Sequence, residues 1–382
     1  MKRRVAMLLL VLFLAAFSQG CWNYRELDKL RIVAGIAIDR GETKKYRVTV
    51  DLLTTFRASK DKPVESVYLD SEGDTLFDAI RGFAKMSSNK LYFPHCQVVV
   101  ISTEVAQDSI QPIIDFLMRD SEPRYTLQLL VANGCQAKDA LQQQVVTMSI
   151  SSYEIDSIVE NNWRYVGTSE SVYLYEAYNT LARTGKSLAL PAVRLVESDG
   201  EKTAQVQGMA VFKSDRLLGF LSGEETKDYL FITNEIDTGL FTVQGPVGND
   251  IAALEILSAR SRISHRENGG AVEYHVDIQI VAALNELDTT QDFIQESGEK
   301  LLIGIAQKQI SDRLIHTIRD VQQRYGVDIF GFGTNLHRTD AAAWQKVHDV
   351  WDDVFKTMKV DVTTTITIKN SGALNSPVEV GR

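Results

Sequence analysis

The sequence is poor in cysteine, with three among 382 residues, at positions 21, 96 and 135. Small secreted domains held together by disulfides carry many more, because the bridges substitute for a large core. Cys96 and Cys135 make no disulfide framework in so long a chain, and we expect both to be unpaired, partly buried thiols. The apolar fraction of 44% is instead sufficient to build hydrophobic cores.

The sequence also lacks a hydrophobic run long enough to cross a membrane as a helix. The run from Val5 to Phe17 has 13 residues, whereas a transmembrane helix needs roughly 17–25. It follows a basic start at positions 2–4 and precedes Ser18-Gln19-Gly20, which is the layout of a secretory signal peptide. We therefore predict a lipoprotein signal at residues 1–20 and a water-soluble polypeptide after it.

Cys21 lies directly behind this signal, which predicts the attachment of lipid. In that chemistry the thiol takes a diacylglycerol, the signal is cut before it, and the new amino group is acylated. Two or more acyl chains, at ~0.8 kcal/mol per buried methylene, hold a protein on a membrane where one chain does not. An ordinary cleaved signal with an unmodified cysteine is the alternative. We expect Trp22 at the headgroup level, contacting the membrane or a membrane partner together with Arg25 and Glu26.

Excess positive charge is absent as well. The chain has 41 basic and 50 acidic residues, a net charge of −9. Removing residues 1–20 takes away three basic residues, which leaves 38 against 50 and a net charge of −12. Binding to nucleic acid or to anionic lipid headgroups needs basic patches, so we expect no nucleic-acid partner. The lipid at Cys21, rather than charge, is then the expected membrane anchor.

The sequence does contain a mixture of strand and helix patterns. Polar and apolar residues alternate in the expected strands, and apolar residues recur every three or four positions in the expected helices. The expected strands are 32–39, 46–56, 97–101, 125–131, 204–212, 217–221, 272–284 and 362–368. The expected helices are 74–87, 108–119, most of 136–190, 293–325 and 342–358. Because the two types do not alternate regularly, the fold class is α+β, with mixed or antiparallel sheets flanked by helices and a long amphipathic helix in the C-terminal half.

Further details of this pattern concern boundaries and faces. The polar stretch 197–202 predicts an N-terminal α+β domain at 21–198 and a C-terminal α+β region at 199–382, which is either one unit or two subdomains split near 260. Ser222 and Glu225 have the spacing of a helix capping box. The strand at 46–56 is expected to be half-buried. Phe77 is placed on the inner face of the helix at 74–87, and Leu301 on that of the helix at 293–325.

Patterns that carry catalysis are largely missing. Gly331-Phe332-Gly333 has Leu336 where a dinucleotide-binding fingerprint needs its third glycine, and the segment follows a helix. His95 and Cys96 are adjacent on an expected strand and therefore point to opposite faces, so they do not share a proton. The six histidines lack the spacing of zinc ligands. We expect no catalytic residue, cofactor or metal, and we expect the chain not to be an enzyme.

Trp344 and Trp351 are the remaining candidates for a ligand pocket. Their spacing of seven, with valines between them, is typical of one helix face. We therefore expect both tryptophans to be packed in a hydrophobic core.

Several segments, taken in order, resemble one protein family. They are Gly20–Leu27, Ile32–Asp39, Leu91–His95, Asp115–Asp120, Gly208–Phe212 and Asp328–Gly333, with Trp344 and Trp351 after the last. This succession is similar to the Ger(x)C family of spore germination lipoproteins, which are the C subunits of nutrient germinant receptors. The resemblance covers nearly the whole chain, which makes it more specific than any single motif.

The resemblance implies a three-domain α+β body and a position on the outer face of the spore inner membrane. It implies a non-enzymatic role beside an A subunit and a polytopic B subunit, in a complex that senses nutrients and starts germination. A solute-binding lipoprotein of a transporter is the alternative, and it predicts two α/β lobes with parallel sheets and a cleft between them. A cell-wall hydrolase is a third option, but the sequence shows no paired acids or metal site for it.

Overall fold

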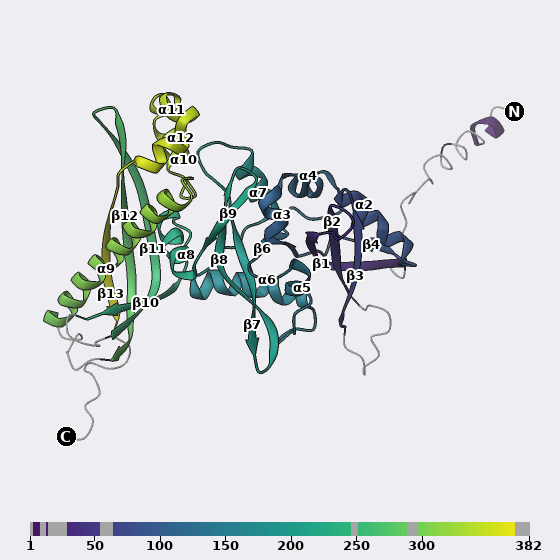
Figure 1. Cartoon of the computed structure of the whole chain (residues 1–382), viewed down its shortest axis with the longest axis horizontal. Helices are drawn as coiled ribbons and strands as arrows, with labels where there is room; N and C mark the ends of the chain where they lie inside the picture. The colour runs from purple at the N-terminus through teal and green to yellow at the C-terminus, as the bar shows by residue number, and fades with distance from the viewer. Residues whose placement is uncertain are drawn as a thin grey trace, which may run out of the picture.

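The computed structural model describes residues 3–7, 13, 29–53, 64–245, 251–288 and 296–370. In these ranges the chain forms two sheets that follow one another along an elongated molecule (Figure 1). Helices flank both sheets, and each sheet mixes parallel with antiparallel neighbours. The expected α+β class with mixed sheets is therefore confirmed.

The first sheet has nine strands in the described residues, in the order β3-β2-β1-β5-β6-β7-β8-β9, with β4 beside β1. These strands are β1 (Leu30–Arg40), β2 (Tyr46–Leu53), β3 (Ser66–Gly73), β4 (Lys90–Tyr92), β5 (Val98–Ile101), β6 (Gln128–Ala132), β7 (Ala189–Ser198), β8 (Glu201–Lys213) and β9 (Arg216–Leu221). The centre, β1-β5-β6-β7, is parallel. Antiparallel hairpins extend it on both sides, including the two that the sequence predicts around 32–56 and 204–221.

Helices cover both faces of this sheet. On one face α5 (Ala137–Leu141) and α6 (Ser151–Asn161) pack on a small cluster that includes Val98, Val100 and Leu130. The other face carries α2 (Leu76–Gly82), α3 (Thr103–Asp108), α4 (Gln111–Arg119) and α7 (Leu174–Leu181), with a short turn at Phe83–Lys85 (η2). A π-helical turn, Asn162–Val166 (η3), directly continues α6. Neighbouring residues of the central strands point to opposite faces and are buried on both, as expected for parallel strands between helices.

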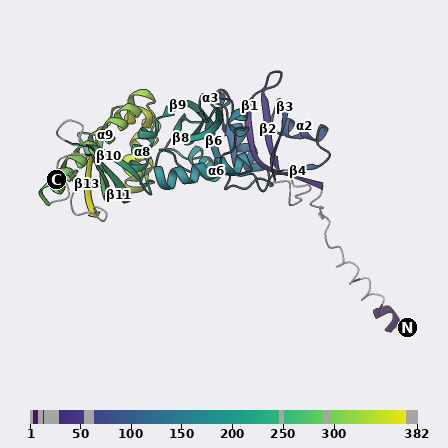
Figure 2. The same ribbon diagram turned by 90° about the horizontal axis from the view of Figure 1, so that it is seen from below.

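Within the described ranges, the second sheet has four strands in the order β10-β11-β12-β13. They are β10 (Gly239–Gln244), β11 (Ile251–Asn268), β12 (Ala271–Asp288) and β13 (Val360–Asn370). The long helix α9 (Glu296–Arg324) lies along one face (Figures 1 and 2). Its residues Leu302, Ile310 and Ile318 are buried. Other helices of the described C-terminal half are α8 (Gly223–Thr233), α10 (Phe332–Thr339), α11 (Ala341–Val347) and α12 (Trp351–Thr357), with η4 (His348–Val350). The predicted long amphipathic helix of the C-terminal half is therefore present.

Several details differ from the expectations. Strand β2 is buried on both faces rather than half-buried, because α6 covers Asp51, whose Oδ2 accepts hydrogen bonds from Ser152 N (3.1 Å) and Oγ (2.6 Å). The helical expectation for 136–190 is wrong at its end, where β7 begins at Ala189. Pro191 is tolerated there because the pairing of β7 with β8 is irregular at that point.

Helix boundaries and faces also differ. The helix expected at 108–119 begins at Gln111, and the one expected at 342–358 is divided into α11, η4 and α12. Leu301 is 41% exposed, and its neighbour Leu302 is buried in its place. Phe77 is 52% exposed, because Leu76 and Ala79 form the buried face of α2.

The polar stretch at 197–202 forms the turn between β7 and β8, two strands of the first sheet. The two sheets separate later, between Leu221 and Gly239, where α8 lies. The division into 21–198 and 199–382 stays a prediction about folding units.

Candidate functional site

The junction of the two sheets is built around α8. Its N-terminus has the predicted capping box: Ser222 N donates to Glu225 Oε2 at 2.7 Å, and Glu225 N donates to Ser222 Oγ at 3.3 Å. Residues 226–232 are all buried, because α8 contacts β8 and β9 of the first sheet and β11, β12 and α9 beyond them. A helix buried all round, with charged residues on it, needs internal partners for those charges.

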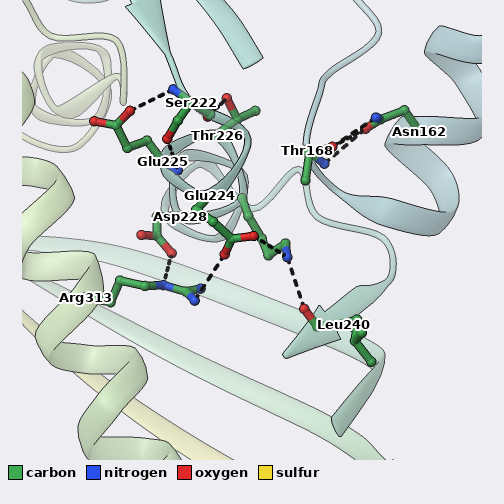
Figure 3. A network of polar contacts seen from close by, with 10 residues as sticks. Asn162, Thr168, Ser222, Glu224, Glu225, Thr226, Asp228, Leu240 and Arg313 are labelled. Carbon is green, nitrogen blue, oxygen red and sulfur yellow. Dashed lines mark hydrogen bonds and ion pairs between the residues drawn. The ribbon is translucent and has the colours of Figure 1, made fainter. Parts of the chain in front are cut away.

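The most buried of these charges is Asp228, which is 1% exposed. Its Oδ1 accepts from Arg313 Nε at 2.8 Å (Figure 3). Its Oδ2 accepts from Thr317 Oγ1, also at 2.8 Å, so the carboxylate ties α8 to α9. Burial raises the pKa of Asp228 to about 6, and the charge of Arg313 and the hydroxyl of Thr317 oppose that rise. The pair is therefore an internal link whose loss would leave a buried group without a partner.

A second link joins α8 to the edge strand β10. Lys227 Nζ donates to the carbonyl oxygen of Leu240 at 3.1 Å and lies 3.2 Å from Glu224 Oε1 (Figure 3). Arg313 Nη1 lies 3.4 Å from the other oxygen of Glu224. The three charged side chains therefore join α8, α9 and β10 into one network.

Toward the first sheet, α8 meets the segment that follows α6. Tyr229 Oη donates to Glu170 Oε2 at 2.8 Å, and burial raises the pKa of Glu170 to about 7. Asn162 in the η3 turn holds the same segment, since its Oδ1 accepts from Thr168 N at 3.0 Å (Figure 3). Its Nδ2 donates to Val206 O at 2.8 Å. Polar contacts thus fix α8 on both sides.

A third part of the junction is the segment Asp328–Gly333. Asp328 is buried, and its carboxylate accepts from Gly331 N and Gly333 N at 2.8 Å each and from Trp351 Nε1 at 3.2 Å. The loop before β7 is hydrogen-bonded to this segment and to the residue after it. Ser187 N donates to Asp328 O at 2.6 Å, and Thr334 N donates to Gly185 O at 2.9 Å. The role of this segment is to fold the C-terminal helices onto the loop before β7.

A cleft with a volume of about 840 Å³ opens beside this segment. Its lining comes from the loop 183–188, the β8–β9 turn and the residues around α12. Both signs of charge are present: Lys213 pairs with Asp352 at 2.9 Å, and Lys356 pairs with Asp353 at 2.9 Å. Because these charges already pair with each other, the cleft is a polar contact region between the first sheet and the C-terminal helices.

The structure tests the predictions for some of the singled-out residues, and the other residues lie outside the described ranges. Trp344 and Trp351 are buried, with ring centroids 5.4 Å apart, and the prediction that they are core residues is confirmed. Both described cysteines are free, as predicted, and burial raises the pKa of Cys96 to about 12. Cys21, Trp22, Arg25 and Glu26 lie outside the described residues.

The groups that matter most at the junction were missed by sequence reasoning. Asp228 and Arg313 are 85 positions apart, and no local pattern links them. Asp328 begins the segment Asp328–Gly333 already singled out, and two glycines just after an aspartate are a signal for a carboxylate that caps a turn.

The described ranges lack two further features. None of their helices combines the length and hydrophobicity needed to cross a bilayer. Nor do they bring together three His, Cys, Asp or Glu side chains in a way that could hold a metal ion.

Two family profiles match consecutive parts of the chain. The profile "Spore germination protein N-terminal domain" matches residues 23–195, and "Spore germination B3/GerAC like, C-terminal" matches residues 207–372. The chain belongs to the Ger(x)C family of spore germination proteins. The first profile ends in β7 and the second begins in β8, so both include strands of the first sheet.

The sequences of individual relatives align with nearly the whole length of this chain. Spore germination protein KC of Bacillus subtilis (strain 168) is 23% identical over 406 residues, covering 99% of this chain and 98% of the relative. Spore germination protein YndF of the same organism is 24% identical over 406 residues, covering 98% and 99%. The crystal structure of the GerBC protein superposes with a TM-score of 0.57 at 18% identity, covering 88% of this chain and 97% of that one, which shows a common fold.

Proposed function

We propose that this chain is a lipid-anchored subunit of a nutrient germinant receptor and is required for nutrient-triggered spore germination. The observation that carries the proposal is the family match, which extends in order over nearly the whole chain. Its partners are the A and B membrane subunits of the receptor, and its location is the outer face of the spore inner membrane. The role is non-enzymatic.

The junction supports a mechanical rather than a chemical role. Three of its charged side chains make hydrogen bonds within the chain. Asp228 binds Arg313, Lys227 binds the carbonyl oxygen of Leu240, and Asp328 caps its own turn. Such links hold the two sheets in one arrangement, so that a contact at one end of the molecule can be transmitted to the other. The subunit would therefore hold the receptor together or pass on its signal.

The alternative is a solute-binding lipoprotein. That class needs two α/β lobes around a ligand cleft. Here the second sheet is mainly an antiparallel arrangement under one long helix, and the cleft charges named above already pair with each other. Purified residues 22–382, tested against amino acids and sugars, separate the two functions: tight binding by this chain alone would favour the solute-binding protein.

The decisive experiment is germination of spores that lack this chain, followed by the fall in optical density. We expect loss of the response to one nutrient class with a normal response to non-nutrient triggers. Normal germination with every nutrient, in spores without a second receptor, would contradict the proposal.

The anchor is tested by complementing those spores with Cys21→Ala. We expect the variant to be released from membranes or to keep its signal, and not to restore germination. Cys135→Ala removes a half-buried thiol elsewhere in the chain and is the matched control, expected to restore it. A correctly processed, fully membrane-bound Cys21→Ala protein would show that the lipid is not attached there.

A further inference from the structure

One long strand edge is left open in the described part of the molecule. β13 is the last strand of the second sheet, pairs with β12 on one side, and lies at the end of the molecule away from β1–β3 (Figures 1 and 2). It has 11 residues, and the seven from Val362 to Ile368 carry no charge, glycine or proline. Unprotected edges of this kind offer a row of unpaired N–H and C=O groups to another strand.

In the described residues, the outer strands β3, β9 and β10 are protected in the usual ways. β3 carries the acidic residues Asp70 and Glu72. β9 is short and is covered by the end of α9, since Tyr325 Oη donates to Phe220 O at 2.8 Å. β10 has six residues and is bonded at its end to Gln309 of α9. Against this background the long, uncharged edge of β13 is an exception that needs a partner.

The charges at the two ends of β13 indicate what that partner is. Asp361 and Lys369 are exposed on the same face, and neither has an ion-pair partner among the described residues. They are eight positions apart, or roughly 26 Å along an extended strand, so they cannot pair within one chain. In an antiparallel pair of two β13 strands centred on Thr365, each Asp361 lies at the end where the other strand carries Lys369, which stands at an irregularity in the pairing of β13 with β12.

The same register matches the rest of the strand. Thr363 then faces Thr367 on the exposed side, and Val362 faces Ile368 on the side that α9 covers. The core face and the solvent face of the two sheets therefore stay aligned across the new pair. A two-fold axis of this type is the commonest symmetry of protein dimers.

We propose that β13 is a self-association edge, which pairs antiparallel with β13 of a second copy of this chain to join two four-stranded sheets into one. The opposite charges at its ends select this register and exclude a parallel pairing, which would place like charges together. The proposal does not depend on the receptor function.

Cross-linking tests the geometry in the full-length chain in membranes. Thr365→Cys places a thiol at the two-fold axis, where it faces its own copy, and we expect oxidation or a short bis-thiol reagent to yield dimers of this chain. Thr242→Cys is the matched control, an exposed threonine on the other edge strand of the same sheet. Equal dimer yields from the two variants, or cross-linking of the Thr365→Cys variant to a different protein, would overturn the proposal.

Charge reversal tests the pairing itself. Asp361→Lys and Lys369→Asp each create two like-charge contacts per dimer, so we expect each variant alone to lose self-association by about tenfold. Mixing the two variants restores both unlike pairs, and so does placing both changes in one chain. Both residues are exposed and have no ion-pair partner among the described residues, so folding should be unaffected, which circular dichroism checks. Failure of both restorations would rule out this register.

Discussion

At the scale of single residues, the junction depends on a carboxylate whose partners lie on another element. Asp228→Ala leaves Arg313 Nε and the hydroxyl of Thr317 without their acceptor, while Arg313 Nη1 keeps its contact with Glu224. Breaking a buried pair by removing one partner costs about 3–5 kcal/mol. Because Arg313 is partly exposed, we expect a loss at the low end, about 3 kcal/mol, in the free energy of unfolding measured with urea at pH 7.

Asp312→Ala is the matched control for that prediction. Asp312 is an exposed aspartate on α9, and its pair with Lys308 lies in solvent. Exposed pairs contribute about 0–1 kcal/mol, so this variant should unfold close to wild type. An equal loss of unfolding free energy in the two variants would show that the buried Asp228–Arg313 pair stabilises the fold no more than an exposed pair.

The raised pKa of Glu170 predicts that the free energy of unfolding depends on pH. Burial raises its pKa from 4.5 to about 7, so between these values the folded chain keeps a proton that the unfolded chain has released. The resulting stabilisation is fully present below about pH 4.5 and is lost as the pH rises through about 7, by on the order of 3 kcal/mol.

Glu170→Gln tests this, because the amide still accepts the hydrogen bond of Tyr229 but does not titrate. Burial also raises the pKa values of Asp228 and Asp328, so the informative quantity is the difference between the two proteins. We expect the free energy of unfolding of wild type to fall more steeply from pH 5 to 7.5 than that of the variant. Parallel pH profiles would count against a buried, protonated Glu170.

Single residues also show where sequence reasoning reaches its limit. Trp344 and Trp351 could be placed in the core because their spacing is local. Asp51 could not be recognised as buried, because the helix that covers it begins a hundred residues later, with Ser152 as its partner. Partners that the fold brings together from distant positions leave no periodic signal.

At the scale of elements, substitution by alanine is expected to have opposite effects on stability at two glycines that lie on different helices. A Cβ on Gly333 would lie 2.7 Å from the ring of Trp351 and 2.8 Å from Gly185 Cα, whereas one on Gly304 in α9 meets nothing within 4 Å. Overpacking costs about 1–3 kcal/mol, so we expect Gly333→Ala to be destabilised by about that much. Gly304→Ala should be stabilised by up to about 1 kcal/mol. Thermal unfolding of both variants measures the contrast, and a neutral Gly333→Ala would show that α10 and α12 are loosely packed.

The elements that the sequence predicted well are those with a strong local pattern. β12 alternates without a break, and α8 has its capping box. β11 pairs with β12 along most of its length but was missed, because its outer half reads Ser-Ala-Arg-Ser-Arg-Ile-Ser-His-Arg and has few apolar residues to reveal the alternation. β7 was missed because its apolar start and Pro191 look like the end of a helix. In both strands, pairing with neighbours outweighs local propensity.

At the scale of the whole molecule, one cluster of buried residues runs from the first sheet through α8 into the second. β1 begins at Leu30, nine residues after Cys21, a length that spans at most about 30 Å. An anchor at Cys21 would therefore keep the first sheet near the membrane. The edge of β13, at the other end of the molecule, would remain free for a second copy (Figure 2).

The charge of the molecule gives a last prediction about that anchor. Residues 22–382 carry a net charge of −12 and should not bind anionic vesicles at any salt concentration, since headgroup binding needs basic patches. The lipidated full-length chain should co-sediment with the same vesicles at low and at physiological salt, because acyl-chain insertion is not screened. Binding of residues 22–382 at low salt that disappears as salt is added would instead reveal a basic surface. In that case charge, and not the lipid alone, would hold the protein to the membrane.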